Sequence, residues 1–474
     1  QYLNDVGLGY LTLNRKSNTL SGGESQRIQL AASLGSNLVG SIYVLDEPSV
    51  GLHSKDTEKL IKVLNKLRDL GNTIIVVEHD ELIIKSADHI IDIGPYAGSL
   101  GGEINAYGSL SKFLKKETLT SKYLSGNLKI LKKRQNKSNK NYISLIGARE
   151  NNLKNINVKF PLDCLTLITG ISGSGKTTLV KNILYPALQR RFNDYSFKPG
   201  DFSSLEGDFD ELKGVEYIDQ NPIGKSSRSN PVTYIKVYDD IRTLFSSLEL
   251  SKIRDYKPKH FSFNVDGGRC EKCKGEGSLT IEMQFMADVV IECNECKGTR
   301  FKNEICEVQY NGKSINDILN MTVDDSIVFF QSNNYNRIAQ KLKPLSDVGV
   351  GYIKLGQSSS TLSGGEAQRI KLASFLSNRS FDKKVLFIFD EPTTGLHFHD
   401  INKLVNSFYH LIEKGHSIIV VEHNLDLIKI ADHIIDLGPG AGEKGGEIIA
   451  EGNLEKIIKN KNSFTGKYLL KQLN

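Results

Sequence analysis

The sequence has no long apolar run and little cysteine. No stretch of about 18 apolar residues occurs, so we expect neither a membrane span nor a signal peptide. Six cysteines in 474 residues are too few for a disulfide scaffold. The charge is nearly balanced, and the formal net charge of +6 permits nucleic-acid binding without arguing for it. At 474 residues the chain is long enough for two or three domains, and 39% apolar and 24% charged residues fit a soluble globular protein, which we expect to be cytoplasmic.

One glycine-rich stretch, Gly170-Ile-Ser-Gly-Ser-Gly-Lys-Thr177, matches the pattern G-x-x-x-x-G-K-[ST] in full. Residues 165–168 predict a buried strand before it, and residues 177–184 predict a helix after it. In that setting backbone N–H groups face phosphate oxygens, Lys176 reaches the β- and γ-phosphates, and Thr177 sits on Mg²⁺. The flanking elements disfavour the alternative, a glycine-rich turn with a solvated lysine. The predicted nucleotide-binding residues are Gly170, Ser172, Gly173, Ser174, Gly175, Lys176, Thr177 and Thr178.

The chain also contains two copies of one sequence module in tandem. The first copy contains Leu20-Ser-Gly-Gly-Glu-Ser-Gln-Arg-Ile28, Leu45-Asp-Glu-Pro-Ser-Val-Gly-Leu-His53, Ile74-Ile-Val-Val-Glu-His79 and Ala87-Asp-His-Ile-Ile-Asp92. The second contains Leu362-Ser-Gly-Gly-Glu-Ala-Gln-Arg-Ile370, Phe389-Asp-Glu-Pro-Thr-Thr-Gly-Leu-His397, Ile418-Ile-Val-Val-Glu-His423 and Ala431-Asp-His-Ile-Ile-Asp436. The phosphate loop precedes the second copy only. The missing half of the first copy would lie before Gln1, and we therefore expect a fragment.

Each copy alternates short apolar strands with helices. In the first copy, Ser21 is expected to cap a helix that runs to about Ala32, with Glu24 completing a capping box. The other elements predicted there are strands at 42–45, 73–77 and 89–93 and an amphipathic helix at 54–70. This alternation predicts an α/β fold with a mostly parallel sheet covered on both faces.

Four cysteines have the spacing of a metal site. Cys270, Cys273, Cys293 and Cys296 form C-x₂-C-x₁₉-C-x₂-C, within the window for a four-thiolate zinc site. They lie in an insertion, residues 190 to about 345, with a hairpin expected between the two pairs. Two unrelated pairs or a redox pair are the alternatives, and the double spacing favours zinc. Cys164 and Cys306 are expected to be buried core thiols.

Acidic residues and a histidine follow predicted strands of the second copy. Asp390 and Glu391 end the strand at 385–389, where an aspartate can hold Mg²⁺ and a glutamate can polarise the attacking water. His423 ends the strand at 417–421 and would lie near the γ-phosphate. A structural strand-end histidine is the alternative, but both copies carry Val-Val-Glu-His. Gln220, after the phosphate loop, is a weaker candidate for sensing Mg²⁺ and water.

Together these motifs resemble those of the ABC ATPase superfamily, and within it the chain is similar to the UvrA family of bacterial nucleotide excision repair. The most distinctive stretches are Asp219-Gln-Asn-Pro-Ile-Gly224, Arg228-Ser-Asn-Pro231, Asp266-Gly-Gly-Arg-Cys-Glu-Lys-Cys273, Ile281-Glu-Met283 and Asp390-Glu-Pro-Thr-Thr-Gly-Leu-His397. The resemblance implies tandem ABC-type nucleotide-binding domains, the first truncated, with a zinc-binding α+β signature domain inserted in the second.

The resemblance also implies that ATP is bound between the copies. Ser21, Gly22, Gly23 and Glu24 would close over ATP held by residues 170–178, with Asp390 at the Mg²⁺ and Glu391, His423 and Gln220 as catalytic residues. The half-sites formed by Asp46, Glu47 and His79 and by residues 363–366 lack a phosphate loop and are expected to be inactive.

The expected domains are the end of the first ATPase domain at 1–130, a basic linker at 131–141, the second ATPase domain at 142–225 and 346–474, and the insertion at 226–345, with its zinc module at about 262–302. The linker is expected to be solvated, with a DNA-contacting tether as the alternative. The insertion through which the family binds UvrB is absent from this sequence.

The function implied is ATP-dependent recognition of damaged or distorted duplex DNA, as the ATPase and not the nuclease of an excinuclease complex, in a protein expected to be a homodimer when intact. One alternative is a transporter ATPase subunit, which the zinc insertion disfavours. Another is a chaperone-type zinc module, suggested by Cys270-x-x-Cys-x-Gly-x-Gly277. Lys225, Arg228 and Arg242 are expected to contact DNA phosphates, with simple solvation as the alternative.

Overall fold

The computed structural model describes residues 2–17, 22–35, 39–130, 141–210, 212–224, 226, 228–283, 288–377 and 384–473. Ser21, Lys225 and linker residues 131–140 lie outside these ranges. The chain forms two compact units, described separately below. The core unit comprises residues 1–96, 100–219 and 381–474, and the helical unit comprises residues 97–99 and 220–380. None of the described helices has the length and apolar character needed to cross a membrane.

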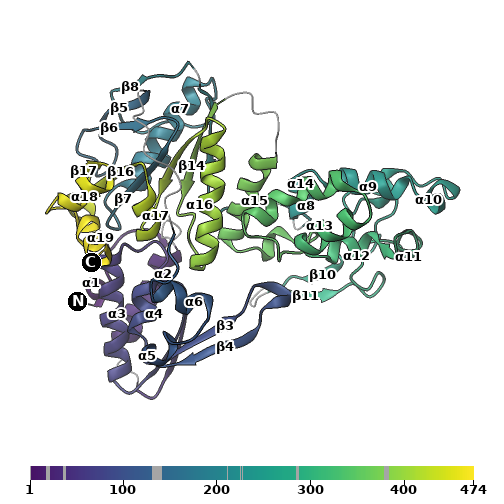
Figure 1. Cartoon of the computed structure of the whole chain (residues 1–474), viewed down its shortest axis with the longest axis horizontal. Helices are drawn as coiled ribbons and strands as arrows, with labels where there is room; N and C mark the ends of the chain where they lie inside the picture. Colours follow the sequence, from purple (N-terminus) through teal and green to yellow (C-terminus); the bar gives the residue numbers. More distant parts are fainter. Residues whose placement is uncertain are drawn as a thin grey trace. The chain divides into compact units, whose positions relative to one another are not determined.

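A six-stranded sheet lies at the centre of the core unit (Figure 1). Its order is β17 (Glu447–Gly452), β16 (His433–Gly438), β7 (Leu165–Gly170), β15 (Ser417–Val421), β14 (Lys384–Asp390) and β9 (Leu212–Ile218). All neighbours are parallel except β16 and β17. Every residue of β7 and β15 is buried, as the unbroken apolar runs in their sequences predict. This sheet confirms the prediction of a mostly parallel sheet for the second copy.

Helices and a second sheet surround the six-stranded sheet. Helix α16 (Phe398–Glu413) packs on β15, and its Phe408 ring lies 4.7 Å from that of Phe389 on β14. A π-helical segment, Thr178–Leu184, follows the phosphate loop and continues into α7 (Tyr185–Arg191). The antiparallel sheet β6 (Ile156–Pro161), β5 (Tyr142–Ala148) and β8 (Ser204–Gly207) shares its hydrophobic core with β7. The remaining helices of the second copy are α17 (Leu425–Ile430), α18 (Leu454–Lys459) and α19 (Phe464–Leu473).

The first copy forms a smaller assembly in the same unit. Strand β1 (Ile42–Asp46) pairs in parallel with β2 (Thr73–Val77), and β3 (Ile90–Gly94) pairs antiparallel with β4 (Glu103–Gly108). Its helices are α1 (Tyr2–Asp5), α2 (Gly22–Gly35), α3 (Ser54–Asp69), α4 (Glu81–Ser86), α5 (Leu110–Phe113) and α6 (Leu119–Leu124). The predicted helices and strands of this copy are thereby confirmed to within a few residues.

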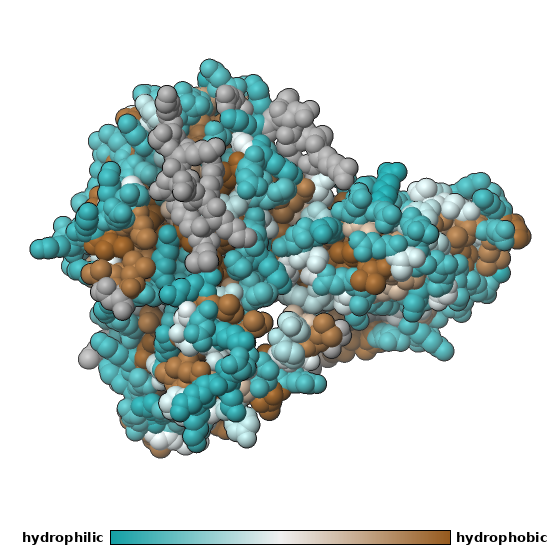
Figure 2. All heavy atoms as spheres, viewed as in Figure 1, coloured by the Kyte–Doolittle hydropathy of each residue, from teal (hydrophilic) through white to brown (hydrophobic). Residues whose placement is uncertain are grey.

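The first copy's strands are not covered on both faces, and that prediction is wrong. In the second copy, β7 lies between β15 and β16, which correspond to β2 and β3. Among the described residues, no strand joins β2 to β3. One face of the sheet formed by β1 and β2 is open: on β1, Ile42 and Val44 are 69% and 67% exposed, and on β2, Ile75 and Val77 are about half exposed. Apolar residues are visible on the surface of this part of the molecule in Figure 2.

The helical unit is built mainly from short helices. They are α8 (Pro231–Tyr234), α9 (Tyr238–Ser246), α10 (Glu249–Ile253), α11 (Asn303–Cys306), α12 (Ile315–Asn320), α13 (Val323–Ser332), α14 (Asn336–Asp347) and α15 (Gly364–Ser377). The predicted hairpin is present as β10 (Ser278–Ile281) and β11 (Val289–Glu292), and a shorter one pairs β12 (Gln309–Tyr310) with β13 (Lys313–Ser314). Helix α15 begins with a reciprocal cap, in which Ser363 N donates to Glu366 Oε2 and Glu366 N donates to Ser363 Oγ.

Candidate nucleotide site and metal centre

The phosphate loop has a backbone that requires glycine. Gly170, Gly173 and Gly175 have φ of +135°, +77° and +108°, a region that other residues rarely adopt. A β-carbon on Gly170 would lie 2.1 Å from the Leu437 carbonyl oxygen. The loop follows β7 and leads into a helical segment, so its N–H groups lie at a helix N-terminus.

Polar side chains of this loop fit a bound phosphate. Lys176 Nζ donates to the carbonyl oxygens of Gly170 (2.9 Å) and Ile171 (3.1 Å). Burial lowers the pKa of Lys176 to about 8, because the ammonium has lost its water. The buried hydroxyls of Ser174 and Thr169 have no hydrogen-bond partner among the described residues. The loop and the residue before it thus contribute one buried cation and two hydroxyls without a partner among the described residues, a set that suits an anionic ligand.

Asp390 and Glu391 lie at the end of β14. This strand belongs to the same sheet as β7 and is separated from it by β15. Tyr217 on β9 donates its hydroxyl to Asp390 Oδ2 at 2.7 Å. Glu391 has a left-handed φ of +46°, and its N–H donates to the Val421 carbonyl. Burial raises the pKa of the Glu391 carboxyl to about 7, and Asp390 adds to the shift. A carboxylate with this pKa can accept a proton from water near neutral pH.

A glutamate that the sequence analysis did not single out fixes the position of His423. Glu422 Oε1 accepts the N–H of Thr393 (3.0 Å) and its hydroxyl, while Oε2 accepts the N–H groups of His423 and Asn424. The His423 ring is buried, its Nδ1 has no hydrogen-bond partner among the described residues, and burial lowers its pKa well below the ordinary value. Burial therefore favours the neutral form of His423.

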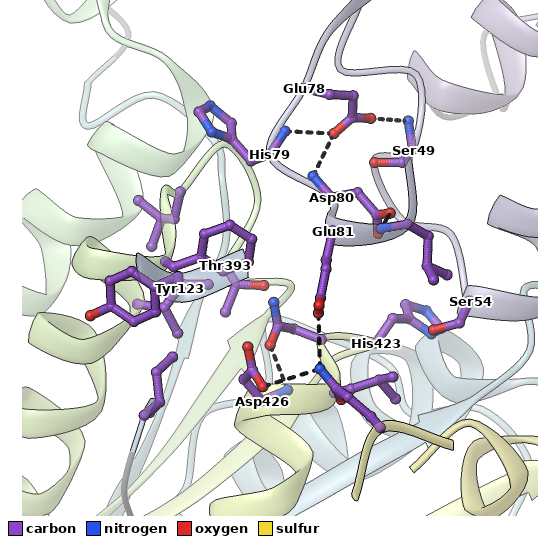
Figure 3. A pocket seen from close by; sticks show the side chains of 18 of the residues that line it. Ser49, Ser54, Glu78, His79, Asp80, Glu81, Tyr123, Thr393, His423 and Asp426 are labelled. Carbon is purple, nitrogen blue, oxygen red and sulfur yellow. Dashed lines mark hydrogen bonds between the residues drawn. The ribbon is translucent and has the colours of Figure 1, made fainter. Parts of the chain in front are cut away.

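The first copy repeats this arrangement. Glu78 accepts the N–H of Ser49 at Oε1 and the N–H groups of His79 and Asp80 at Oε2, as Figure 3 shows. His79 Nε2 lies 3.9 Å from Glu47 Oε1. The signal for both glutamates was already present in the repeated Val-Val-Glu-His, where the histidine alone drew attention.

The first copy packs directly on the phosphate loop of the second. Ser172 Oγ donates to the Gly51 carbonyl at 3.1 Å. Tyr10 donates its hydroxyl to Glu24 on α2 at 2.6 Å, and a β-carbon on Gly173 would lie 3.1 Å from the Tyr10 ring. Of the predicted closing residues, Gly22, Gly23 and Glu24 begin α2, and Ser21 lies outside the described residues.

A cavity of about 660 Å³ lies between the two copies within the core unit. Glu47 and His79 of the first copy and Glu391 and His423 of the second line it, and Figure 3 shows both histidines. Residues of the two half-sites thus line one cavity.

Gln220 and residues 363–366 belong to the helical unit. A β-carbon on Gly364 would lie 3.0 Å from the Gln220 β-carbon, so these two predicted residues are adjacent. Tyr352 donates its hydroxyl to Glu366 at 2.6 Å, which repeats the contact between Tyr10 and Glu24.

The four predicted metal ligands come together in the helical unit. The sulfurs of Cys270 and Cys293 are 3.9 Å apart and those of Cys273 and Cys296 are 3.6 Å apart, with all four within 4.8 Å. A tetrahedral zinc with bonds of about 2.3 Å requires sulfurs about 3.8 Å apart. Gly277 N donates to the Cys273 sulfur, as is usual for a thiolate ligand. Of the other thiols, Cys164 is buried as predicted and Cys306 is half-buried.

The predicted DNA-contacting arginines have acidic neighbours. Arg228 Nε lies 3.7 Å from Glu276 Oε1, and Arg242 pairs with Asp239 and covers the Tyr238 ring. Lys225 lies outside the described residues.

Sequence comparisons identify a consistent set of relatives. The chain is 55% identical over 474 residues to UvrABC system protein A of Clostridium perfringens, covering all of this chain and 50% of the relative. It is 53% identical over 470 residues to the protein of the same name from Staphylococcus epidermidis, covering 99% of this chain and 49% of the relative. The chain thus spans about half the length of these curated relatives. No protein-family model matches it.

Comparison with solved structures finds a protein with a name of the same kind. UvrA2 from Deinococcus radiodurans has a TM-score of 0.93 and 43% sequence identity, covering 100% of this chain and 57% of that one. A chain from a model of ribosome-bound archaeal Pelota and ABCE1 has a TM-score of 0.55 at 19% identity, which indicates a shared fold alone.

Proposed function

The chain is homologous over its whole length to about half of UvrABC system protein A, and from this we propose that it binds and hydrolyses ATP to control binding to damaged duplex DNA. The observation that carries the proposal is one cluster in the core unit. It contains a phosphate loop with a buried lysine, a glutamate whose pKa is near neutrality, and the signature helix of the other copy.

The proposed chemistry is hydrolysis at one composite site, made of the phosphate loop of the second copy and residues 21–24 of the first. Lys176 and the backbone N–H groups of residues 170–178 bind the phosphates. Thr177 and Asp390 would hold Mg²⁺, which when bound neutralises phosphate charge. Glu391 accepts a proton from the attacking water, which His423 helps to orient.

The other half-sites are proposed to be inactive. Asp46, Glu47 and His79 have no phosphate loop of their own copy within this sequence, and residues 363–366, which would close over that same first-copy loop, lack it too. One ATP-hydrolysing site per chain is therefore expected. The domain boundaries given above, with a nucleotide-binding domain interrupted by the zinc-containing insertion, are part of the same proposal.

The proposed partner is distorted duplex DNA, recognised through its shape and not its base sequence. Zn²⁺ held by the four cysteines would order the hairpin β10–β11. UvrB, whose binding insertion this sequence lacks, and a second copy are partners proposed for the intact protein from the homology alone. The zinc insertion disfavours the alternative of a transporter ATPase subunit.

The test is binding of the purified chain to lesion-bearing and intact duplexes of one sequence, with and without ATP. We expect tighter binding to the lesion and a dependence on ATP that Lys176→Ala abolishes. Equal affinity for both duplexes under all conditions would contradict the DNA-repair assignment, and ATP hydrolysis without DNA binding would favour the transporter class.

A further inference from the structure

Two hydrogen-bond relays of the same composition cross between the copies inside the core unit. Each runs from an aspartate through a threonine to the histidine that ends the motif Asp-Glu-Pro-x-x-Gly-Leu-His of the opposite copy. The buried relay consists of Asp436, Thr465 and His53. The outer relay consists of Asp92, Thr120 and His397.

The donors and acceptors of the buried relay are determined by its neighbours. His53 Nδ1 accepts the N–H of Lys55 at 3.2 Å, so the ring proton is on Nε2. Nε2 therefore donates to Thr465 Oγ1 (3.1 Å), which in turn donates to Asp436 Oδ1 (3.0 Å). His53 and Thr465 are 0% exposed and Asp436 is 3% exposed. Burial lowers the pKa of His53 to about 3, so the ring stays neutral in this arrangement.

The outer relay repeats the pattern in a less buried setting. His397 Nδ1 accepts the N–H of His399, and its Nε2 is 3.0 Å from Thr120 Oγ1. Thr120 Oγ1 donates to Asp92 Oδ1 at 2.8 Å. Both threonines occur in a repeated motif, Leu119-Thr-Ser-Lys-Tyr-Leu124 and Phe464-Thr-Gly-Lys-Tyr-Leu469. The two relays therefore occupy equivalent positions in the two copies.

The buried relay connects the two sides of the composite site. Asp436 is on β16, opposite Thr169 of β7, one residue before the phosphate loop. His53 is two residues after Gly51, whose carbonyl accepts the Ser172 hydroxyl. The His53 ring also meets the His423 ring edge to face, with centroids 5.9 Å apart.

We propose that Thr465 and His53 are positioning residues that hold residues 49–53 of the first copy against the phosphate loop of the second, through Asp436. The outer relay performs the same task for the half-site around Glu47, which has no phosphate loop in this sequence. Loss of the buried relay therefore affects ATP turnover, and loss of the outer relay does not. The inference rests on the proposed ATP hydrolysis for its kinetic consequence, but not for the loop position itself.

The experiment compares Thr465→Val, which removes the hydroxyl while keeping the side-chain shape, with the matched Thr120→Val. In the 474-residue chain, Thr465→Val is expected to lower kcat for ATP about 10-fold with little change in KM, because both hydrogen bonds of the hydroxyl are lost and residues 49–53 are held less firmly. Thr465→Ser is expected to restore kcat, and Thr120→Val to leave it unchanged. Equal losses in the two valine variants, or no loss in Thr465→Val, would overturn the inference.

Amide hydrogen exchange provides a readout that does not depend on turnover. Exchange of residues 49–53 is expected to quicken in Thr465→Val and to stay unchanged in Thr120→Val, without ATP. Unchanged exchange in Thr465→Val overturns the inference whatever the ATPase result, whereas absence of hydrolysis by the unmodified chain contradicts only the proposed function. Should Thr465→Val not fold, His53→Phe keeps the ring contacts and removes both nitrogens. It is expected to show the same quickened exchange, and unchanged exchange in folded His53→Phe overturns the inference.

Discussion

Gly51 of the first copy lies against the carboxylate of Glu391 of the second: a β-carbon on Gly51 would be 3.2 Å from Oε2. The opposite pair repeats the contact, because a β-carbon on Gly395 would be 3.1 Å from Glu47 Oε1. Both glycines have a left-handed φ, +69° and +66°. Each glutamate at a strand end therefore faces a glycine of the other copy.

These two glycine contacts allow an effect on ATP turnover to be distinguished from an effect of backbone strain. Gly51→Ala and Gly395→Ala should each destabilise the fold by about 1 kcal/mol, because alanine disfavours a positive φ. Only Gly51→Ala should lower ATP turnover, by about 10-fold or more, since Glu391 alone serves a site with a phosphate loop. Steady-state ATPase assays beside thermal denaturation measure both effects. Similar turnover losses in the two variants would mean that strain alone is responsible.

The metal prediction concerns stoichiometry. Freshly purified protein should contain about one zinc per chain. Cys293→Ser should lose it and unfold the hairpin β10–β11, while Cys306→Ser, a thiol outside the cluster, should retain it. Elemental analysis and amide exchange across residues 278–292 provide the measurements. Zinc below half an equivalent in the unmodified chain would count against the four-thiolate site.

The ionisation of Asp80 is expected to make the folding stability of the chain depend on pH. It caps α4 by accepting the N–H groups of Leu82 and Ile83, yet burial and the nearby Glu78 raise its pKa from 3.8 to about 6. An acid with a raised folded pKa binds its proton more tightly when folded. Its contribution to stability is therefore present below about pH 4 and is lost as pH rises to about 6.

Asparagine keeps the cap without the charge, and Asn424 caps α17 in this way in the second copy. Asp80→Asn should therefore raise the free energy of unfolding at pH 7.5 by about 1 kcal/mol, with a smaller gain at pH 4.5. The reciprocal Asn424→Asp should destabilise the chain at pH 7.5. Urea unfolding at the two pH values tests this, and a gain that does not depend on pH would contradict the ionisation argument.

The proposed DNA contacts predict a change in salt dependence. If Arg228 binds a phosphate, Arg228→Ala should weaken binding similarly on all sequences and reduce the slope of log affinity against log salt by roughly one unit. Lys225→Ala and Arg242→Ala are expected to behave alike. Because Arg228 faces Glu276, Glu276→Gln should strengthen binding. Unchanged slopes in all three alanine variants would remove this segment from the DNA path and direct attention to Arg269 and Arg300 beside the cysteines.

Local sequence patterns predicted the elements that their own residues determine. The strand β7, its glycine loop and the cysteine pairs follow from short-range spacing and burial. The exposed face of β1 and β2 could not be predicted, because apolar strand residues do not reveal whether another element covers them. The partners of His53 and His397 are hundreds of residues away, and only the repeat of Thr120 and Thr465 in matching motifs could have revealed them.

The account's central claim is that one composite site, built on the only phosphate loop of this sequence, hydrolyses ATP. The most direct measurement is the steady-state ATPase rate of Lys176→Ala, with the exposed Lys198→Ala as the matched control. Removing a cation that stabilises phosphate charge should lower kcat about 100-fold, while Lys198→Ala should match the unmodified chain. Near-unmodified turnover by a folded, zinc-containing Lys176→Ala would contradict the account.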